Sequence, residues 1–183
     1  SIFLVGDGKE FNTVLIYPDH ENCPLDLNFE NDKTIRDFFS SIILSVNSFL
    51  APFERIVNYV LIHRDFSQEK GELTHKGTFI RTQVLKNFKK IIDPLYEKNY
   101  VSLYNNSKEV RIPNWLTREI GTVKNNISWD GKILTIKDQS KKMNLNWIDN
   151  NIQIGDFIYA TKSSLIDFEI IIQAPELWLG NLN

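Results

Sequence analysis

A single loop lysine, Lys76, is the residue with the clearest capacity for chemistry in this sequence. It stands between Thr74-His75 and Gly77, in a polar stretch that leads directly into a helix-patterned segment. An ammonium group on a four-carbon stem is a compact, movable point charge. Placed between two anions, it lowers the cost of their approach and stabilises the charge that develops as they react. The sequence therefore predicts a mobile cation held on a rigid support.

The residues around Lys76 are expected to shape the loop. Gly71 suits a turn, and Glu72 and Thr74 can fix the loop through bonds from their side chains to the backbone. Arg81, in the first turn of the following helix, could hold the loop or approach a phosphate, although an arginine there is more often simply exposed. We treat Arg81 as a candidate nucleotide-contacting residue.

Strands and helices alternate up to about residue 100. Two β-branched and aromatic runs, residues 2–5 and 11–17, flank a Gly-Asp-Gly-Lys turn and predict a hairpin. Residues 55–63 are almost continuously apolar, which predicts a strand covered on both faces and central in its sheet. The polar residues 18–33, with two prolines, predict a surface loop.

Apolar residues at spacings of three and four predict two helices. The expected buried stripe of the first is Ile35, Phe38, Phe39, Ile42, Val46, Phe49 and Leu50. The expected buried stripe of the second is Ile80, Val84, Leu85, Phe88, Ile91, Ile92 and Leu95. The basic residues of the second helix are expected to face away from this stripe.

Beyond Asn105 the pattern changes to short strands separated by polar turns. Strands are predicted at residues 132–136, 143–147, 152–160 and 168–172. Asn114 could cap one short helix. The expected fold is α+β: a small mixed sheet with packed helices at residues 1–104, followed by a small β-rich module at residues 105–183.

Composition narrows the function classes. With 21 basic and 23 acidic side chains the formal charge is −2, so no overall field favours nucleic acid, and no apolar run is long enough to cross a bilayer. Cys23 is the only cysteine, which fits the reducing cytoplasm. The cysteine and histidines have no metal-site spacing, so we expect no metal. A chain that starts inside a strand-like run is expected to be a piece of a longer polypeptide.

Three sequence segments, in this order along the chain, are similar to a known family: FLVGDGKEFNTVLIYPD, PFERIVNYVLIHRDFSQEKGELT and GELTHKGTFIRTQVLKNFKKIIDPLY. Over about residues 1–100 the chain resembles the C-terminal lid subdomain of AMP-forming acyl-CoA synthetases, most closely the long-chain fatty-acid group. The resemblance implies a ligase that converts a fatty acid, ATP and CoA into acyl-CoA, AMP and pyrophosphate. It implies ATP, Mg²⁺ and CoA for the full-length enzyme, with none of them bound by this fragment alone. The implied partner is the enzyme's own N-terminal adenylation domain, without which the fragment is expected to be inactive.

The resemblance also implies an adenylation lysine, for which two positions compete. The family pattern is Thr or Ser, one or two residues, Lys, two residues and Arg. If Arg81 keeps the family register, the lysine position falls on Thr78. If the loop carries two extra residues, Lys76 is the adenylation lysine, and we favour this alternative because Gly77 lets the loop shift its reach.

Two other functions stay open. The chain could be a non-catalytic module derived from a lid, which recruits a protein or ligand through its β-rich half. The parent enzyme could also load a carrier protein or feed a reductase instead of acting on CoA.

Overall fold

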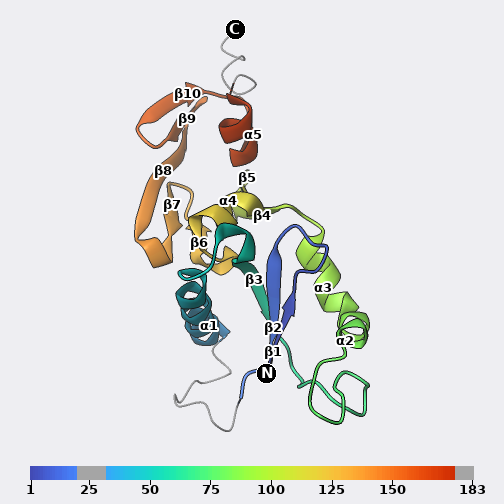
Figure 1. The fold of residues 1–183 in the computed structure, drawn as a ribbon. Helices are drawn as coiled ribbons and strands as arrows, with labels where there is room; N and C mark the ends of the chain where they lie inside the picture. The colour runs from blue at the N-terminus through green and yellow to red at the C-terminus, as the bar shows by residue number, and fades with distance from the viewer. Residues whose placement is uncertain (20–31, 176–183) are drawn as a thin grey trace.

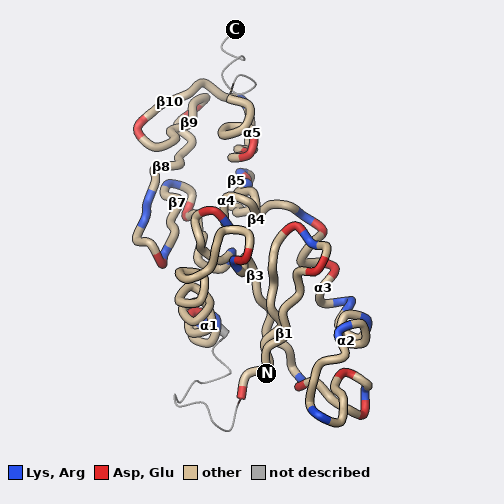
Figure 2. The backbone as a smooth tube through the Cα atoms, viewed as in Figure 1, with Lys and Arg blue, Asp and Glu red and all other residues tan. Residues whose placement is uncertain are grey.

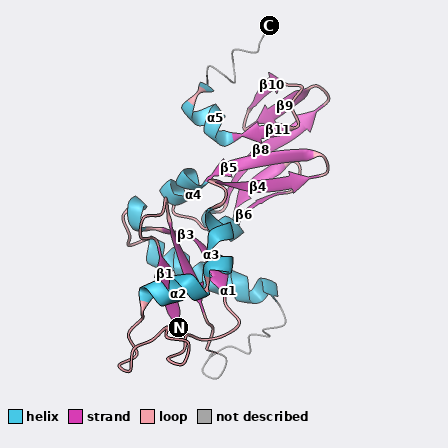
Figure 3. Cartoon of the chain, turned by 90° about the vertical axis from the view of Figure 1, so that its right-hand side faces the viewer, coloured by secondary structure: helices cyan, strands magenta, loops and turns pink. Residues whose placement is uncertain are grey.

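The computed structural model describes residues 1–19 and 32–175 and has the predicted α+β architecture (Figure 1). Most of the loop expected at residues 18–33 lies outside the described residues. The N-terminal half is a small sheet with helices on both faces, and the C-terminal half is rich in strands (Figure 3). No helix in the described ranges is both long and apolar enough to span a bilayer.

The first sheet has three strands in the order β1-β2-β3. Their bounds are β1 Ile2–Val5, β2 Asn12–Ile16 and β3 Ile56–Leu61. The predicted hairpin is confirmed, because β1 pairs antiparallel with β2. The expectation that the third strand is central is wrong: among the described residues β3 pairs only with β2, in parallel, and is an edge strand. Its apolar character reflects cover on both faces, since Tyr59 packs in one core cluster and Val60 against the other.

Helices cover both faces of this sheet (Figure 1). Helix α1 (Asp32–Asn47) lies on one face, where Ile43 packs with Val14 and Tyr59. Helices α2 (Arg81–Asn87) and α3 (Lys89–Tyr96) lie on the other face. The core there contains Phe3, Val5, Leu15, Ile62, Phe66, Val84, Phe88 and Ile92. Alternation along β2 explains the division, because successive side chains of a strand point to opposite faces.

The predicted buried stripe of α1 is partly wrong. Ile35 and Ile43 are buried, but Ile42, Val46 and Phe49 are 41%, 44% and 87% exposed. The helix is therefore rotated from the expected orientation.

Two buried polar residues explain this rotation of α1. Ser40 forms a hydrogen bond with the Tyr59 hydroxyl at 2.9 Å. The Asn47 amide donates to the carbonyl of Ile56 at 2.8 Å and accepts from its N–H at 2.9 Å, which satisfies the start of the edge strand. An apolar pattern alone could not reveal that polar residues face inward here.

The second predicted helix is divided into α2 and α3 at Phe88, whose backbone is at φ −98° and ψ 11°. The Phe88 ring is buried and lies 5.3 Å from the Phe66 ring, centroid to centroid. Arg81, Lys86 and Lys89 are exposed, as expected.

The C-terminal half contains two further sheets. The first has the order β11-β5-β4, with β4 Tyr100–Asn105, β5 Lys108–Pro113 and β11 Leu165–Asp167. The second is an antiparallel meander of β6 Ile127–Trp129, β7 Ile133–Ile136, β8 Lys141–Ile148, β9 Asn151–Ile154 and β10 Phe157–Ala160. The expected boundary near residue 105 coincides with the turn between β4 and β5, and the division into two domains stays a prediction.

Two local predictions in this half are wrong. Residues 168–172 form helix α5 (Phe168–Gln173), not a strand, because the Asp167 carboxylate caps it by accepting from the Glu169 N–H at 2.9 Å. Asn114 is the first residue of α4 (Asn114–Ile120) but makes no capping bond. Its Nδ2 instead donates to the Lys98 carbonyl at 3.0 Å.

Residues beyond 105 also pack on the first sheet. Val123 is fully buried in the cluster formed by α1, β2 and β3. The Arg55 guanidinium, just before β3, donates to the carbonyls of Arg118 and Glu119 at 3.1 and 2.7 Å. The end of α4 is thus fixed against the start of the edge strand.

Candidate functional site

Lys76 lies near the tip of a tight hairpin turn. Leu73 and Phe79 form a β-bridge at its base. The Thr74 carbonyl accepts from the Gly77 N–H at 2.9 Å, which makes Lys76 the third residue of a β-turn. Gly77 follows at φ +77°, a left-handed conformation that closes the hairpin.

Thr74 ties the two sides of this turn together. Its N–H donates to the Thr78 carbonyl at 2.8 Å, and its Oγ1 accepts from the Thr78 N–H at 3.1 Å. The expectation that Thr74 fixes the loop is confirmed. Thr78 therefore has both backbone groups bonded, while its side chain is exposed.

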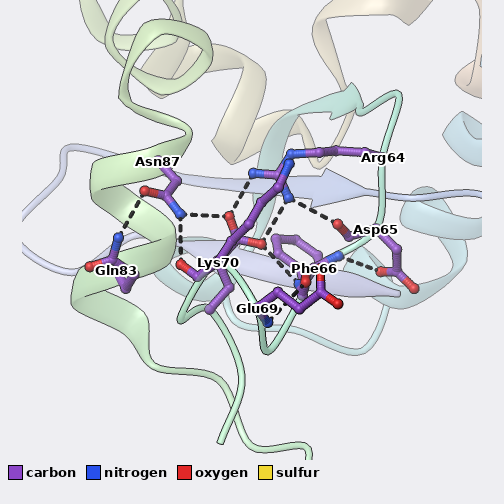
Figure 4. Close-up of polar contacts among 9 residues, drawn as sticks. Arg64, Asp65, Phe66, Glu69, Lys70, Gln83 and Asn87 are labelled. Atoms are coloured by element: carbon purple, nitrogen blue, oxygen red, sulfur yellow. Dashed lines mark hydrogen bonds and ion pairs between the residues drawn. The ribbon is translucent and has the colours of Figure 1, made fainter.

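The base of the hairpin is anchored by the fully buried carboxylate of Glu72. Arg64 donates to both of its oxygens, at 2.6 and 2.8 Å, and Asn87 of α2 donates to Oε1 at 2.8 Å. Figure 4 shows Arg64 and Asn87 pointing toward one another from the strand end and from α2. The Ser67 N–H donates to Oε2 at 3.0 Å, so Glu72 fixes the loop as expected.

These partners change the acidity of Glu72. The hydrogen bonds from Arg64, with smaller contributions from Asn87 and Ser67, lower the pKa of the Glu72 carboxyl to about 2, against the opposing effect of burial. The same contact raises the pKa of Arg64. Glu72 is thus an ionised anchor, which makes the polypeptide beneath Lys76 rigid.

The Lys76 side chain itself is exposed. Within the described ranges, no group accepts a hydrogen bond from its ammonium or pairs with it. The loop lies at the end of the first sheet away from the β-rich half (Figures 1 and 3). The structure thus places an exposed ammonium on a four-carbon stem above a hydrogen-bonded base, and the catalytic role of Lys76 stays a prediction.

Arg81 lies beside this hairpin but contacts the first strand. Its Nη2 donates to the Leu4 carbonyl at 2.9 Å, and its guanidinium carbon lies 4.9 Å from the Phe3 ring centroid. These contacts hold the start of α2 against β1. A guanidinium has five N–H donors, so the bond to Leu4 leaves others for a ligand.

Sequence reasoning missed Arg64 and Asn87. Arg64 follows the apolar run of β3, and Asn87 is the last residue of α2. Neither residue stands in a local sequence pattern that would predict a buried carboxylate as its partner. Only the fold brings both to Glu72. Among residues 1–19 and 32–175, no three His, Cys, Asp or Glu side chains form a group that could hold a metal ion.

A three-stranded mixed sheet with helices on both faces and an exposed lysine hairpin defines a small α+β domain. Residues 1–100, more than half of the chain, match the family model described as AMP-binding enzyme C-terminal domain. The chain belongs to this family, the C-terminal domains of adenylate-forming enzymes. Neither the curated proteins nor the solved structures that were compared with the chain gave a match.

Proposed function

We propose that this chain is the C-terminal part of an AMP-forming acyl-CoA synthetase-like ligase, acting on a long-chain fatty acid, and that Lys76 is its adenylation lysine. The observation that carries the proposal is the exposed Lys76 ammonium on a hairpin anchored by Glu72, within a matched adenylate-forming C-terminal domain. In the proposed reaction a carboxylate attacks the α-phosphorus of ATP, and pyrophosphate leaves.

The role of Lys76 follows from electrostatics. A carboxylate and a triphosphate repel each other, and a cation donating to oxygens of both offsets that repulsion. The lysine stem can enter the site when the lid closes and leave when it reopens, because no described residue holds the ammonium in place. The rigid base limits the conformations that the stem must search, which favours precise delivery.

The neighbouring residues have supporting roles in this proposal. Thr78 and Arg81 are proposed to contact the nucleotide. The exposed Thr78 hydroxyl and the remaining Arg81 donors support these assignments. If Thr78 instead occupies the position of the catalytic lysine, the loop as it stands carries no ammonium there.

The remaining components are proposed to lie outside this chain. ATP, Mg²⁺ and CoA are proposed to bind mainly to an N-terminal adenylation domain of the same enzyme, in the cytoplasm. The chain contributes the lid and its lysine. Alone, it is expected to catalyse neither half-reaction.

A fatty-acid-dependent exchange of pyrophosphate into ATP tests this proposal. The assay uses the longer polypeptide in which this chain follows an adenylation domain, with palmitate as the acid. We expect exchange with palmitate and thioester formation when CoA is added. A polypeptide that binds ATP but shows no exchange with fatty, aryl or amino acids would instead favour the non-catalytic binding module.

A further inference from the structure

An apolar pocket in the β-rich half is separate from the Lys76 hairpin. Its volume is about 470 Å³, within the roughly 300–1,000 Å³ of typical small-molecule sites. Helix α4, the sheet β6-β7-β8 and helix α5 contribute its walls. In Figure 1 these elements extend from the middle of the molecule toward its C-terminal end, away from the loop that carries Lys76.

The apolar walls combine core and surface residues. Ile112, Leu134 and Phe168 are buried, whereas Leu116 of α4 and Met143 of β8 are only partly buried. Apart from two lysines, every residue that lines the pocket is apolar. Such a surface gains free energy when hydrocarbon displaces its water.

Strand register places a cation at one edge of this apolar surface. Ile127, Ile136 and Lys141 are directly opposite one another on β6, β7 and β8, so their side chains share one face of the sheet. The next row on that face contains Leu134 and Met143. The Lys141 stem thus extends along the apolar surface while its exposed ammonium reaches water.

The mouth of the pocket near Lys141 is held in place by side-chain bonds. Gln139, in the connection between β7 and β8, donates from Nε2 to the Ile120 carbonyl at 2.8 Å. Thr122 donates to the Asp138 carboxylate at 2.8 Å, so this nearby carboxylate already has a hydrogen-bond partner. Lys142 also borders the pocket, but it is opposite Thr135, so its side chain points to the other face of the sheet. Within the described part of the chain, Lys141 forms no ion pair. Figure 2 shows this basic stretch on β8.

We propose that this pocket binds a long-chain carboxylate, with the hydrocarbon chain against the apolar walls and the carboxylate beside Lys141. Charge complementarity selects the occupant, because a purely apolar ligand would leave the Lys141 ammonium without a partner and a cation would be repelled by it. The site lies outside the family-matched residues 1–100 and requires no nucleotide.

Laurate binding to the full chain, measured by calorimetry without ATP, tests this proposal. We expect saturable one-to-one binding, with methyl NMR shifts at Leu116, Ile136 and Met143. Lys141→Glu should weaken binding about tenfold or more, which corresponds to about 1.4 kcal/mol. The matched control Lys132→Glu, an exposed lysine just before β7 and outside the pocket, should leave the affinity within about twofold of that of the unaltered chain.

Two further measurements test the chemistry of the ligand and the location of its site. Dodecanol, which lacks the carboxylate, should bind more weakly than laurate. Leu116→Trp should fill the pocket and abolish laurate binding while retaining the native circular dichroism spectrum. Lauroyl-CoA distinguishes the free acid from its thioester: tighter binding of laurate supports the proposal. Equal effects of the two lysine variants, tighter binding of dodecanol or lauroyl-CoA, or shifts confined to other methyl groups would overturn it. Because no adenylation is measured, failure here leaves the proposed ligase function unaffected.

Discussion

The Glu72 carboxylate and the Arg64 guanidinium form two hydrogen bonds, Nη2 to Oε1 at 2.6 Å and Nη1 to Oε2 at 2.8 Å. Glu72 is fully buried, while the Arg64 side chain keeps 36% of its surface exposed. This pair closes the loop that leads from β3 toward the Lys76 hairpin. Removing one partner leaves the other charge poorly satisfied, which costs more than the intact pair contributes.

Glu72→Gln should therefore destabilise the fold by about 1–3 kcal/mol at pH 7. The variant keeps the shape of the side chain but loses the charge that Arg64 requires. Urea unfolding measures the change. Glu69→Gln, an exposed residue of the same loop, is the control and should have an effect within about 0.5 kcal/mol.

The same carboxyl predicts a specific pH dependence. Its folded-state pKa of about 2 lies below the ordinary value of 4.5, so its contribution to stability is complete above pH 4.5 and is lost as the pH falls toward 2. The difference in unfolding free energy between the parent chain and Glu72→Gln should shrink across that window. A difference that stays constant from pH 5 to pH 3 would contradict the assigned pKa.

Gly77→Ala should loosen the Lys76 hairpin. Gly77 is at φ +77°, and an added Cβ would meet no atom within 4 Å, so the cost is purely conformational, about 1–2 kcal/mol. Hydrogen exchange of the Thr78 amide, which bonds to Thr74, should become about tenfold faster. Gly77→Asn should have a smaller effect, because asparagine tolerates the left-handed region better. Equal exchange rates in the parent chain and in both variants would refute the turn geometry.

Lys124→Met should stabilise the protein at neutral pH. Burial lowers the pKa of the Lys124 ammonium to about 8, and its ring contact with Phe11, 5.1 Å from the centroid, offsets only part of that cost. We expect a gain of about 1–2 kcal/mol, after allowing for the water that still reaches the side chain. Lys132→Met, at an exposed position, is the control and should change little.

The sign of this effect also predicts how it varies with pH. The folded pKa of Lys124 lies below the unfolded value of 10.5, so the unfolded chain binds more protons between pH 8 and 10.5. Stability of the parent chain due to this group therefore rises across that window. The advantage of Lys124→Met should be largest below pH 8 and decline above it.

Local patterns predicted the elements better than their positions in the fold. The hairpin of β1 and β2 and the exposed lysine loop follow from turn chemistry and periodicity, which are local properties. The edge position of β3 could not be read from its apolar run, because a strand covered by helices resembles a central strand. The inward faces of Ser40 and Asn47 depend on partners in β3 that are distant in sequence.

The candidate site shows the same division. The candidate role of Lys76 and the loop-fixing roles of Thr74 and Glu72 were predicted from the sequence. Their loop contains turn residues and belongs to a segment that resembles the family. Arg64 and Asn87 were missed because their shared partner is buried between a strand end and a helix end. The pocket beside Lys141 was also outside local reasoning, since strand register rather than spacing places that lysine next to Ile136.

The most direct test of the central claim is a single-turnover measurement of the two half-reactions in the longer polypeptide. Lys76→Ala should slow acyl-adenylate formation by roughly 10²–10³-fold, the usual cost of removing one preorganised donor, while thioester formation from supplied acyl-adenylate stays within about twofold. Lys70→Ala, in the same exposed loop, should leave both steps unchanged. Unchanged adenylation in Lys76→Ala, or full rescue of that variant by Thr78→Lys, would contradict the assignment of Lys76.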